Sequence, residues 1–178
     1  MRRMFRRQIR KTLAQEVPPV LQEANFAFSK GEYGRAGELF EKIARVADGR
    51  NGPRAPLFYL QAGRSRVFAG QAGLGMPSLK RGLELFAQRK QFKRLHQFGT
   101  RTVNELNEHG LKNEAVEIEA WLKSVLPDTP SFESPAKRPV LPTHCPSCGA
   151  PLHSDEVEWL DNITAECGYC GSPVREEK

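Results

Sequence analysis

Apolar residues between positions 17 and 126 recur at intervals of three and four, which predicts a series of amphipathic helices. The pattern is clearest around the turn Gly31-Glu32-Tyr33, because one apolar face precedes the turn and a second follows it. These faces consist of Val20, Ala24, Ala27 and Phe28, and then of Ala36, Phe40, Ile43, Ala44 and Ala47. A glycine turn between two helical patterns predicts a pair of antiparallel helices.

A second helix pair follows with a less regular pattern. Residues 56–69 predict one helix, and the glycine-rich residues 70–77 predict a break after it. The next helix is indicated by Leu79, Leu83, Phe86 and Ala87. Within it, Gly82 and Phe86 repeat the spacing of Ala36 and Phe40 in the first pair.

The third unit runs from Phe92 to Leu126, with a turn at Glu108-His109-Gly110. Gly110 and Ala115 keep the offset seen between Gly31 and Ala36. A single pair cannot bury its own apolar faces, so we expect the three pairs to stack.

The first pair resembles a tetratricopeptide repeat. That family's small and aromatic positions, across a unit of about 34 residues, are matched by Ala24, Gly31, Tyr33, Ala36 and Phe40. Glu23 and Ile43 depart from the pattern and the other two units match less well, so a generic antiparallel bundle is the alternative. The resemblance implies a concave surface that binds a protein segment. For the family's clamp on a terminal carboxylate, Asn25 fits, but Leu21 stands where a lysine is wanted.

The cysteines of the chain form two Cys-x-x-Cys pairs near its end, and each pair is followed by glycine. The spacing between the pairs, residues 149–166, falls in the range of a four-cysteine zinc site. A tetrahedral ion with Zn–S bonds of roughly 2.3 Å needs four thiolates from two tight turns, and glycine tolerates the positive φ that such turns require. The predicted metal ligands are Cys145, Cys148, Cys167 and Cys170.

The stretch from His144 to Val174 resembles a zinc ribbon, with two cysteine knuckles on either side of a β-hairpin. The resemblance implies one structural Zn²⁺ on the four cysteines; rubredoxin-like iron sites use the same thiolate set, so iron is the minor alternative. Two short strands are predicted around the turn Asp161-Asn162, with apolar positions at Val157, Trp159, Ile163 and Ala165. A module this small cannot bury enough apolar surface to fold alone. Metal binding therefore has to supply much of its folding free energy, on the order of 10 kcal/mol.

Other uses of the cysteines are less favoured by the pattern. Two disulfides would require an oxidising compartment, which nothing in the sequence indicates. A thioredoxin-type redox pair lies at a strand-to-helix junction, which is not predicted here. A catalytic zinc needs an open position, whereas four thiolates complete the coordination shell. His144 and His153 lie close enough to compete as ligands, but four cysteines already suffice.

The net charge of +6 is unevenly distributed, because residues 144–178 are acidic and the rest of the chain is basic. Residues 1–16 predict a cationic amphipathic helix that could bind an anionic membrane surface, nucleic acid or an acidic protein; a solvated chain end is the alternative. A second basic stretch, residues 80–101, contains interleaved aromatic residues that suit either single-stranded nucleic acid or a helical core. The candidate residues for an anionic partner are Arg2, Arg3, Arg6, Arg7, Arg10, Lys11, Arg89, Lys90, Lys93 and Arg94.

These patterns divide the chain into four parts and predict a mainly α fold. Residues 1–16 form the basic helix, residues 17–126 an array of antiparallel helix pairs, residues 127–143 a proline-rich linker, and residues 144–178 a small β zinc ribbon. The linker predicts a ribbon that lies outside the helical body and binds separately.

The sequence contains no phosphate-binding loop and no nucleophile elbow, so we expect a protein that is not an enzyme and has no small-molecule substrate. We predict a zinc-binding adaptor that contacts a protein partner through its helical repeats and its ribbon. The alternative is a regulatory factor associated with DNA or RNA, and peripheral contact with an anionic membrane is the third hypothesis. With no apolar run of about 18 residues, the expected location is cytoplasmic.

Overall fold

The structure is a computed structural model that describes residues 17–126 and 139–175. The predicted basic helix at residues 1–16 lies outside these ranges, as do residues 127–138 of the linker and residues 176–178. The helices of the described part are α2 (Pro19–Ser29), α3 (Tyr33–Gly49), α4 (Ala55–Phe68), α5 (Ala72–Gln88), α6 (Phe92–Glu108) and α7 (Lys112–Val125). The strands are β1 (Glu158–Trp159), β2 (Thr164–Glu166) and β3 (Pro173–Arg175).

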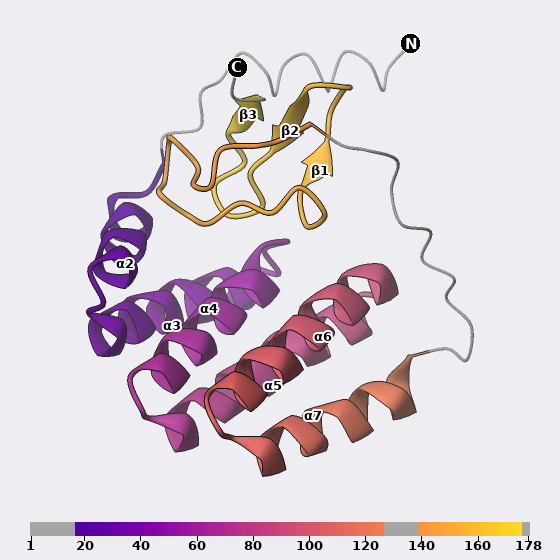
Figure 1. Cartoon of the computed structure of the whole chain (residues 1–178). Coiled ribbons are helices and arrows are strands. Elements are labelled where there is room, and N and C mark those ends of the chain that lie inside the picture. The colour runs from indigo at the N-terminus through magenta and orange to yellow at the C-terminus, as the bar shows by residue number, and fades with distance from the viewer. Residues whose placement is uncertain (1–16, 127–138, 176–178) are drawn as a thin grey trace.

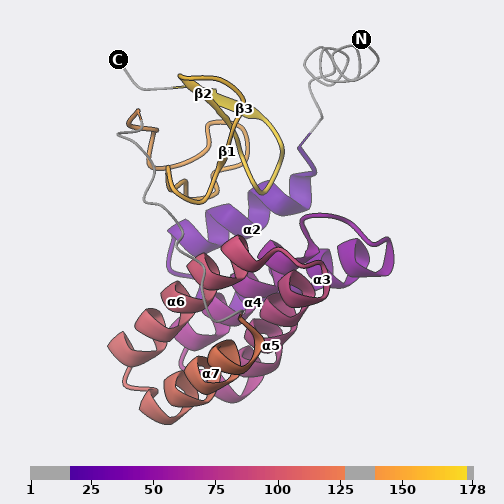
Figure 2. The same ribbon diagram turned by 90° about the vertical axis from the view of Figure 1, so that its right-hand side faces the viewer.

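The protein is mainly helical and carries a small three-stranded antiparallel sheet near its C-terminal end, which confirms the predicted fold class. We refer to residues 17–126 as the helical array and to residues 139–175 as the cysteine module. Figure 1 shows the helices stacked one beside the next, with the sheet on one side of the stack. In Figure 2 the module lies directly over α2, while α5 and α7 lie farther away.

Each helix pair closes with the same turn. Gly31, Gly70 and Gly110 have φ angles of 77°, 72° and 76°. In all three turns the glycine N–H donates to the carbonyl three residues earlier, and the next N–H donates to the carbonyl five residues before it. This is the Schellman pattern that ends many helices. Because glycine adopts positive φ without steric cost, the position of each glycine determines where its pair turns.

The predicted break at residues 70–77 is wrong, because α5 begins at Ala72 and continues through Gly75 and Pro77. The physical reason is the close approach of α4 and α5. A Cβ atom added at Gly75 would lie 2.7 Å from the carbonyl oxygen of Gly63, so the two backbones touch where neither residue has a side chain. Tertiary packing therefore outweighs the low helix propensity of glycine and proline in this segment.

The core consists of two apolar clusters that share α4. This helix is buried on most of its surface, as expected for a central helix with apolar residues all around it. One cluster joins α2, α3 and α4 to the cysteine module, and the other joins α4, α5, α6 and α7. Tyr169 of the module packs against both clusters.

The prediction that the ribbon lies outside the helical body is wrong. Leu141 and all four cysteines belong to the same buried cluster as Leu21, Ala24 and Phe58 of the array. The proline-rich composition predicted a separating linker, yet it carried no information about the apolar surface that the module and α2 bury together.

The apolar face of α2 is also rotated from the predicted one. Val20, predicted to face the core, is 37% exposed, whereas Leu21 and Asn25 are only 2% and 4% exposed. The sequence pattern considered packing against α3 alone. In the structure α2 is covered on a second side by the cysteine module, so positions adjacent to the predicted face are buried as well.

Gly82 tests the close packing of α4 and α5. A Cβ atom at this position would lie 2.8 Å from the carbonyl oxygen of Pro56 and 2.9 Å from Cγ of Leu60. We expect Gly82→Ala to lower the free energy of unfolding by about 1–3 kcal/mol, because a backbone atom cannot move aside at little cost. Urea denaturation measures the change.

The control is Gly73→Ala in the same helix, where an added Cβ meets no atom within 4 Å. It should be neutral or stabilising by up to about 1 kcal/mol through helix propensity. Equal stability of the two variants would contradict the described packing.

Candidate metal centre

The four cysteine sulfurs converge on one point at the end of the molecule nearest α2. Their Sγ atoms all lie within 4.8 Å of one another. The Sγ atoms of Cys145 and Cys170 are 3.7 Å apart, and those of Cys148 and Cys167 are 3.9 Å apart. Four sulfurs at about 2.3 Å from a central tetrahedral ion would be separated by about 3.8 Å. The arrangement therefore fits a tetrahedral metal ion, and it does not distinguish zinc from iron.

Two equivalent turns bring the sulfurs together. The N–H of Gly149 donates to the carbonyl of Cys145, and the N–H of Gly171 donates to the carbonyl of Cys167, each at 2.8 Å. Both glycines have positive φ, 75° and 79°, which confirms the conformation predicted after each cysteine pair. In the second turn the N–H of Ser172 also points at Sγ of Cys170, at 3.5 Å. Each turn thus presents two sulfurs on the same side.

A small sheet connects and supports the two turns. The predicted hairpin is present, with Trp159 opposite Ala165, and its turn is held by Oδ1 of Asp161, which accepts hydrogen bonds from the N–H groups of residues 163 and 164. Ile163, one of the apolar positions of the predicted hairpin, is 53% exposed. The third strand, in which Val174 pairs with Ala165, was not predicted because its apolar run is too short for a strand pattern.

The four thiols are free and buried, and they shift one another's acidity. Hydrogen bonds from Cys148 and Cys167 lower the pKa of Cys145 to about 6. Hydrogen bonds within the group, that to Cys145 first, also lower the pKa of Cys170 and raise the pKa of Cys148 and of Cys167. A divalent cation that binds here displaces the protons that the sulfurs still hold.

A metal ion held by all four sulfurs has no open coordination position. Such closed sites are structural, because a catalytic zinc keeps one position for water or substrate. The group that could hold a metal consists of the four cysteines and includes neither His144 nor His153, both of which are exposed. His144 instead lies with Nδ1 3.1 Å from the hydroxyl of Thr143.

The module is attached to α2 through the backbone of its first cysteine turn. Asn25, buried on α2, donates from Nδ2 to the carbonyl of Cys148 at 2.8 Å and to the carbonyl of Leu21 at 3.0 Å. Gln22, one turn earlier, donates to the carbonyl of Ser147 at 3.1 Å. Two amide side chains of one helix thus bind consecutive carbonyls of the metal-binding turn.

The module also contacts the start of α4. Arg54 forms an ion pair with Glu166 of β2 at 3.1 Å. Next to it, Gly168 lies so close to Leu57 that an added Cβ would be 3.2 Å from Cδ1. The rings of Phe58 and Tyr169 pack with their centroids 6.4 Å apart. The second cysteine turn therefore rests on α4.

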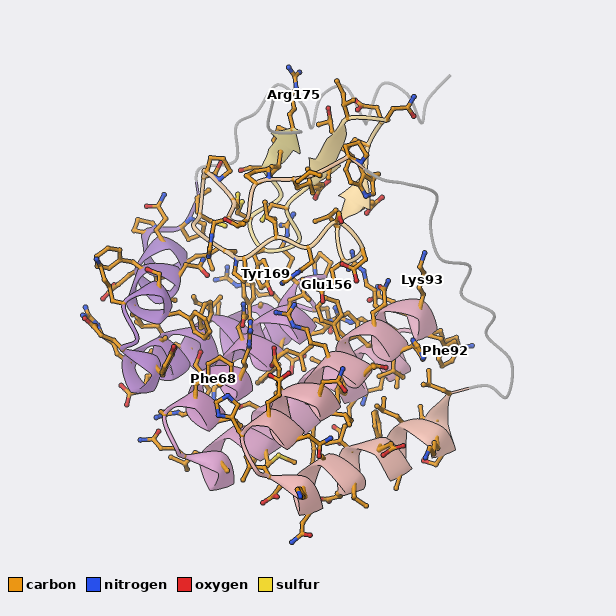
Figure 3. All side chains as sticks on the ribbon, in the orientation of Figure 1. Phe68, Phe92, Lys93, Glu156, Tyr169 and Arg175 are labelled. Atoms are coloured by element: carbon orange, nitrogen blue, oxygen red, sulfur yellow. The ribbon has the colours of Figure 1, made fainter. Side chains whose placement is uncertain are left out.

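The third contact is with α6. Arg101 donates from Nη1 to both carboxylate oxygens of Glu156, each at 3.0 Å, and Gln97 donates to the carbonyl of Asp155 at 3.0 Å. Figure 3 shows Glu156 and Tyr169 on the side of the module that faces the helices. The module consequently contacts the first helix of each of the three pairs.

A partly buried network of charges lies beneath this contact. Glu105 of α6 pairs with Arg64 of α4 at 3.0 Å and with Arg101 at 3.1 Å, and Arg101 continues to Glu156. Burial lowers the pKa of Arg64, and Glu105 opposes that effect. Burial also acts to lower the pKa of Arg101, but Glu156 and Glu105 together raise it above its usual value. Both carboxylates are therefore needed to balance two guanidinium groups.

The predicted basic stretch at residues 80–101 is largely used inside the molecule. Lys80 and Arg81 pair with Glu117 and Asp48, and Arg89 donates to the carbonyl of Gly52. The rings of Phe86 and Phe98 are buried and stacked with their centroids 5.4 Å apart, so these aromatic residues serve the core.

The other candidate residues for an anionic partner fall into two groups. Lys90 and Lys93 are exposed and Arg94 is half-buried at the α5–α6 turn, and Figure 3 shows Lys93 pointing away from the helices. The arginines and lysine predicted near the N-terminus lie outside the described residues. Binding of an anionic partner by either group stays a prediction.

The comparisons with known proteins give no match: no protein-family model fits the chain, and no curated protein or solved structure is significantly similar to it. In the described part of the chain, no helix is both long enough and apolar enough to span a membrane. Fold and site together define a mainly helical protein with a small C-terminal module that is built around four cysteines able to hold a metal ion.

Replacing one cysteine tests the metal centre. We expect Cys148→Ser and Cys167→Ser to abolish stoichiometric metal binding, because three thiolates cannot close the shell, and Ser147→Ala, an exposed neighbour, to retain it. Elemental analysis of purified protein measures both. Metal should also be released as the pH falls, because protons compete with the metal ion for the four thiolates. Metal content that is insensitive to these serines would contradict the site.

Asn25→Ala tests the attachment of the module to α2. Without the amide, the carbonyl of Cys148 loses its buried donor, which should lower the free energy of unfolding by about 1–3 kcal/mol. The control is Asn107→Ala, an exposed asparagine on α6, which should change it by less than about 0.5 kcal/mol. Urea denaturation of metal-loaded protein measures both, and equal effects would argue against the contact.

Proposed function

We propose that the protein is a non-enzymatic zinc-binding adaptor, in which a zinc ribbon and a tetratricopeptide-like helical array act as one unit that binds another protein. The observation that carries the proposal is the closed, buried four-sulfur site whose module lies across the first helices of three successive pairs. A metal with four thiolate ligands supplies folding energy and no reactive position. Its role is then to hold the module in place on the array.

Zinc is the proposed metal because four thiolates from two tight turns are its usual structural ligand set. A Zn²⁺ ion compensates two of the four negative charges of the thiolates. The rest of the module is acidic. The helical pairs support the protein-binding part of the proposal, since stacked pairs present extended surfaces and no cofactor cavity is required for such a role.

A pull-down tests the adaptor function. Full-length tagged protein, expressed in cells and purified with its zinc, should recover a defined protein at constant stoichiometry from nuclease-treated extract, either as purified or after a chelator has removed the zinc. Elemental analysis of the same preparation should give one zinc per chain. Recovery that disappears on nuclease treatment would support the nucleic-acid alternative and contradict the adaptor proposal, and iron in place of zinc would contradict the choice of metal.

A further inference from the structure

The contacts between the helical array and the cysteine module share one direction. In the side-chain hydrogen bonds that five residues of the described array make to the module, the donor lies on the array and the acceptor on the module. The donors are Gln22, Asn25, Arg54, Gln97 and Arg101. The acceptors are the backbone carbonyls of Ser147, Cys148 and Asp155 and the carboxylates of Glu156 and Glu166.

The direction of these hydrogen bonds indicates that the face formed by α2, α4 and α6 binds a ligand rich in hydrogen-bond acceptors. Amide side chains that donate to carbonyls recognise a polypeptide backbone. Guanidinium groups that donate to carboxylates recognise acidic side chains. Gln22 and Asn25 bind two successive carbonyls that a tight turn presents on one side. A chain segment with exposed carbonyls and glutamates matches the whole face.

The charges of this face also favour an acidic ligand. Arg54, Arg64 and Arg101 lie on the array side, where Glu105 is the carboxylate that pairs with two of them. Removing Glu156 and Glu166 would leave partly buried guanidinium groups with too few carboxylates, which is costly. An acidic segment would restore these pairs, whereas a basic one would increase the repulsion.

The ion pair with α6 is open to an approaching ligand at one edge. A polar cleft of about 530 Å³ lies between α6 and residues 153–156, and both Arg101 and Glu156 line it. Asp155 and His153 on the far wall are exposed. The same cleft carries Glu105, Glu108 and Asp155, so it exposes the pair of Arg101 and Glu156 to solvent but does not itself attract an acidic ligand.

Metal binding controls whether the face is covered. The module is too small to fold without its metal, so loss of the metal removes the folded surface that contacts α2, α4 and α6. The array retains the second apolar cluster, formed by α4, α5, α6 and α7, almost entirely from its own residues. Since binding free energies are reciprocal, a segment that competes with the module must also weaken metal binding.

We propose that the face formed by α2, α4 and α6 is a binding site for an acidic protein segment, which the cysteine module occupies while its metal is bound. This inference rests on the proposed adaptor function and names the chemistry of its partner and the condition for binding. The metal-loaded protein is the closed form, and the metal-free protein, or one in which the module is displaced, is the open form.

Fluorescence anisotropy of full-length protein tests the proposal. The probe is a labelled synthetic peptide copying residues 153–166, which contains five acidic residues. Three forms are compared: zinc-loaded, chelator-treated, and zinc-loaded Glu156→Lys/Glu166→Lys, in which charge reversal displaces the module without touching a cysteine. We expect at least tenfold tighter binding to the two open forms than to the zinc-loaded protein.

Two controls identify the surface and the chemistry. Arg101→Ala in the chelator-treated protein should weaken peptide binding at least tenfold, while Lys112→Ala, exposed on α7, should leave it unchanged. A peptide with lysine at the five acidic positions should not bind. Equal affinity for closed and open forms, equal binding of the lysine peptide, or preferential binding of a labelled single-stranded oligonucleotide would each overturn the proposal.

Hydrogen exchange shows whether the array persists in the open form. Chelation should increase amide exchange in residues 139–175 while α5, α6 and α7 keep their protection. Loss of protection in these helices would overturn the proposal, because no face would remain to bind a segment. If the pull-down recovers the same partner with and without chelator, the adaptor function stands and this inference fails; if neither condition recovers a protein, both fail.

Discussion

The convergence of four sulfurs on one point is the constraint on which the C-terminal part of the molecule depends. The module has three very short strands and two hydrogen-bonded turns that each hold two cysteines. Four thiols buried together shift one another's pKa, because neighbouring sulfurs cannot all be charged without a cation. A bound metal removes that conflict and fixes the relative position of both turns.

The fixed turns then determine how the helical array is covered. Asn25 and Gln22 bind carbonyls of the first turn, and Leu57 and Phe58 pack on the second turn at Gly168 and Tyr169. These contacts require the two turns to be held at one separation. Metal coordination in the module and burial of α2 are therefore parts of one energetic unit, linked by hydrogen bonds to the backbone as well as by apolar packing.

The helical array meets a different constraint, which is the close approach of α4 and α5. Glycines stand where the two helices touch, at Gly63, Gly75 and Gly82. They allow backbone contact at the centre of the array, and the larger side chains of Leu79, Leu83 and Phe86 fill the space beside it. Helix α4 also contributes residues to the cluster shared with the module, so one helix packs against both halves of the core.

The sequence alone determined the features that depend on near neighbours. Cysteine spacing identified the four residues that could hold a metal ion, and the glycine after each pair marked the positive φ that the turns adopt. Glycines 31, 70 and 110 are placed where the Schellman turns occur, and helical periodicity identified the mainly α fold. Each of these properties is encoded within a few residues, where backbone sterics decide the conformation.

Only the tertiary structure decided how the two parts of the chain meet. Asn25 and Cys148 are separated by 123 residues, and no local pattern relates them. For the same reason the sequence placed the module away from the helices, assigned Val20 rather than Leu21 to the core, and predicted a break where α5 in fact begins. Burial against a distant surface overrides local preference, because the apolar area and the hydrogen bonds gained there exceed the small differences in intrinsic propensity.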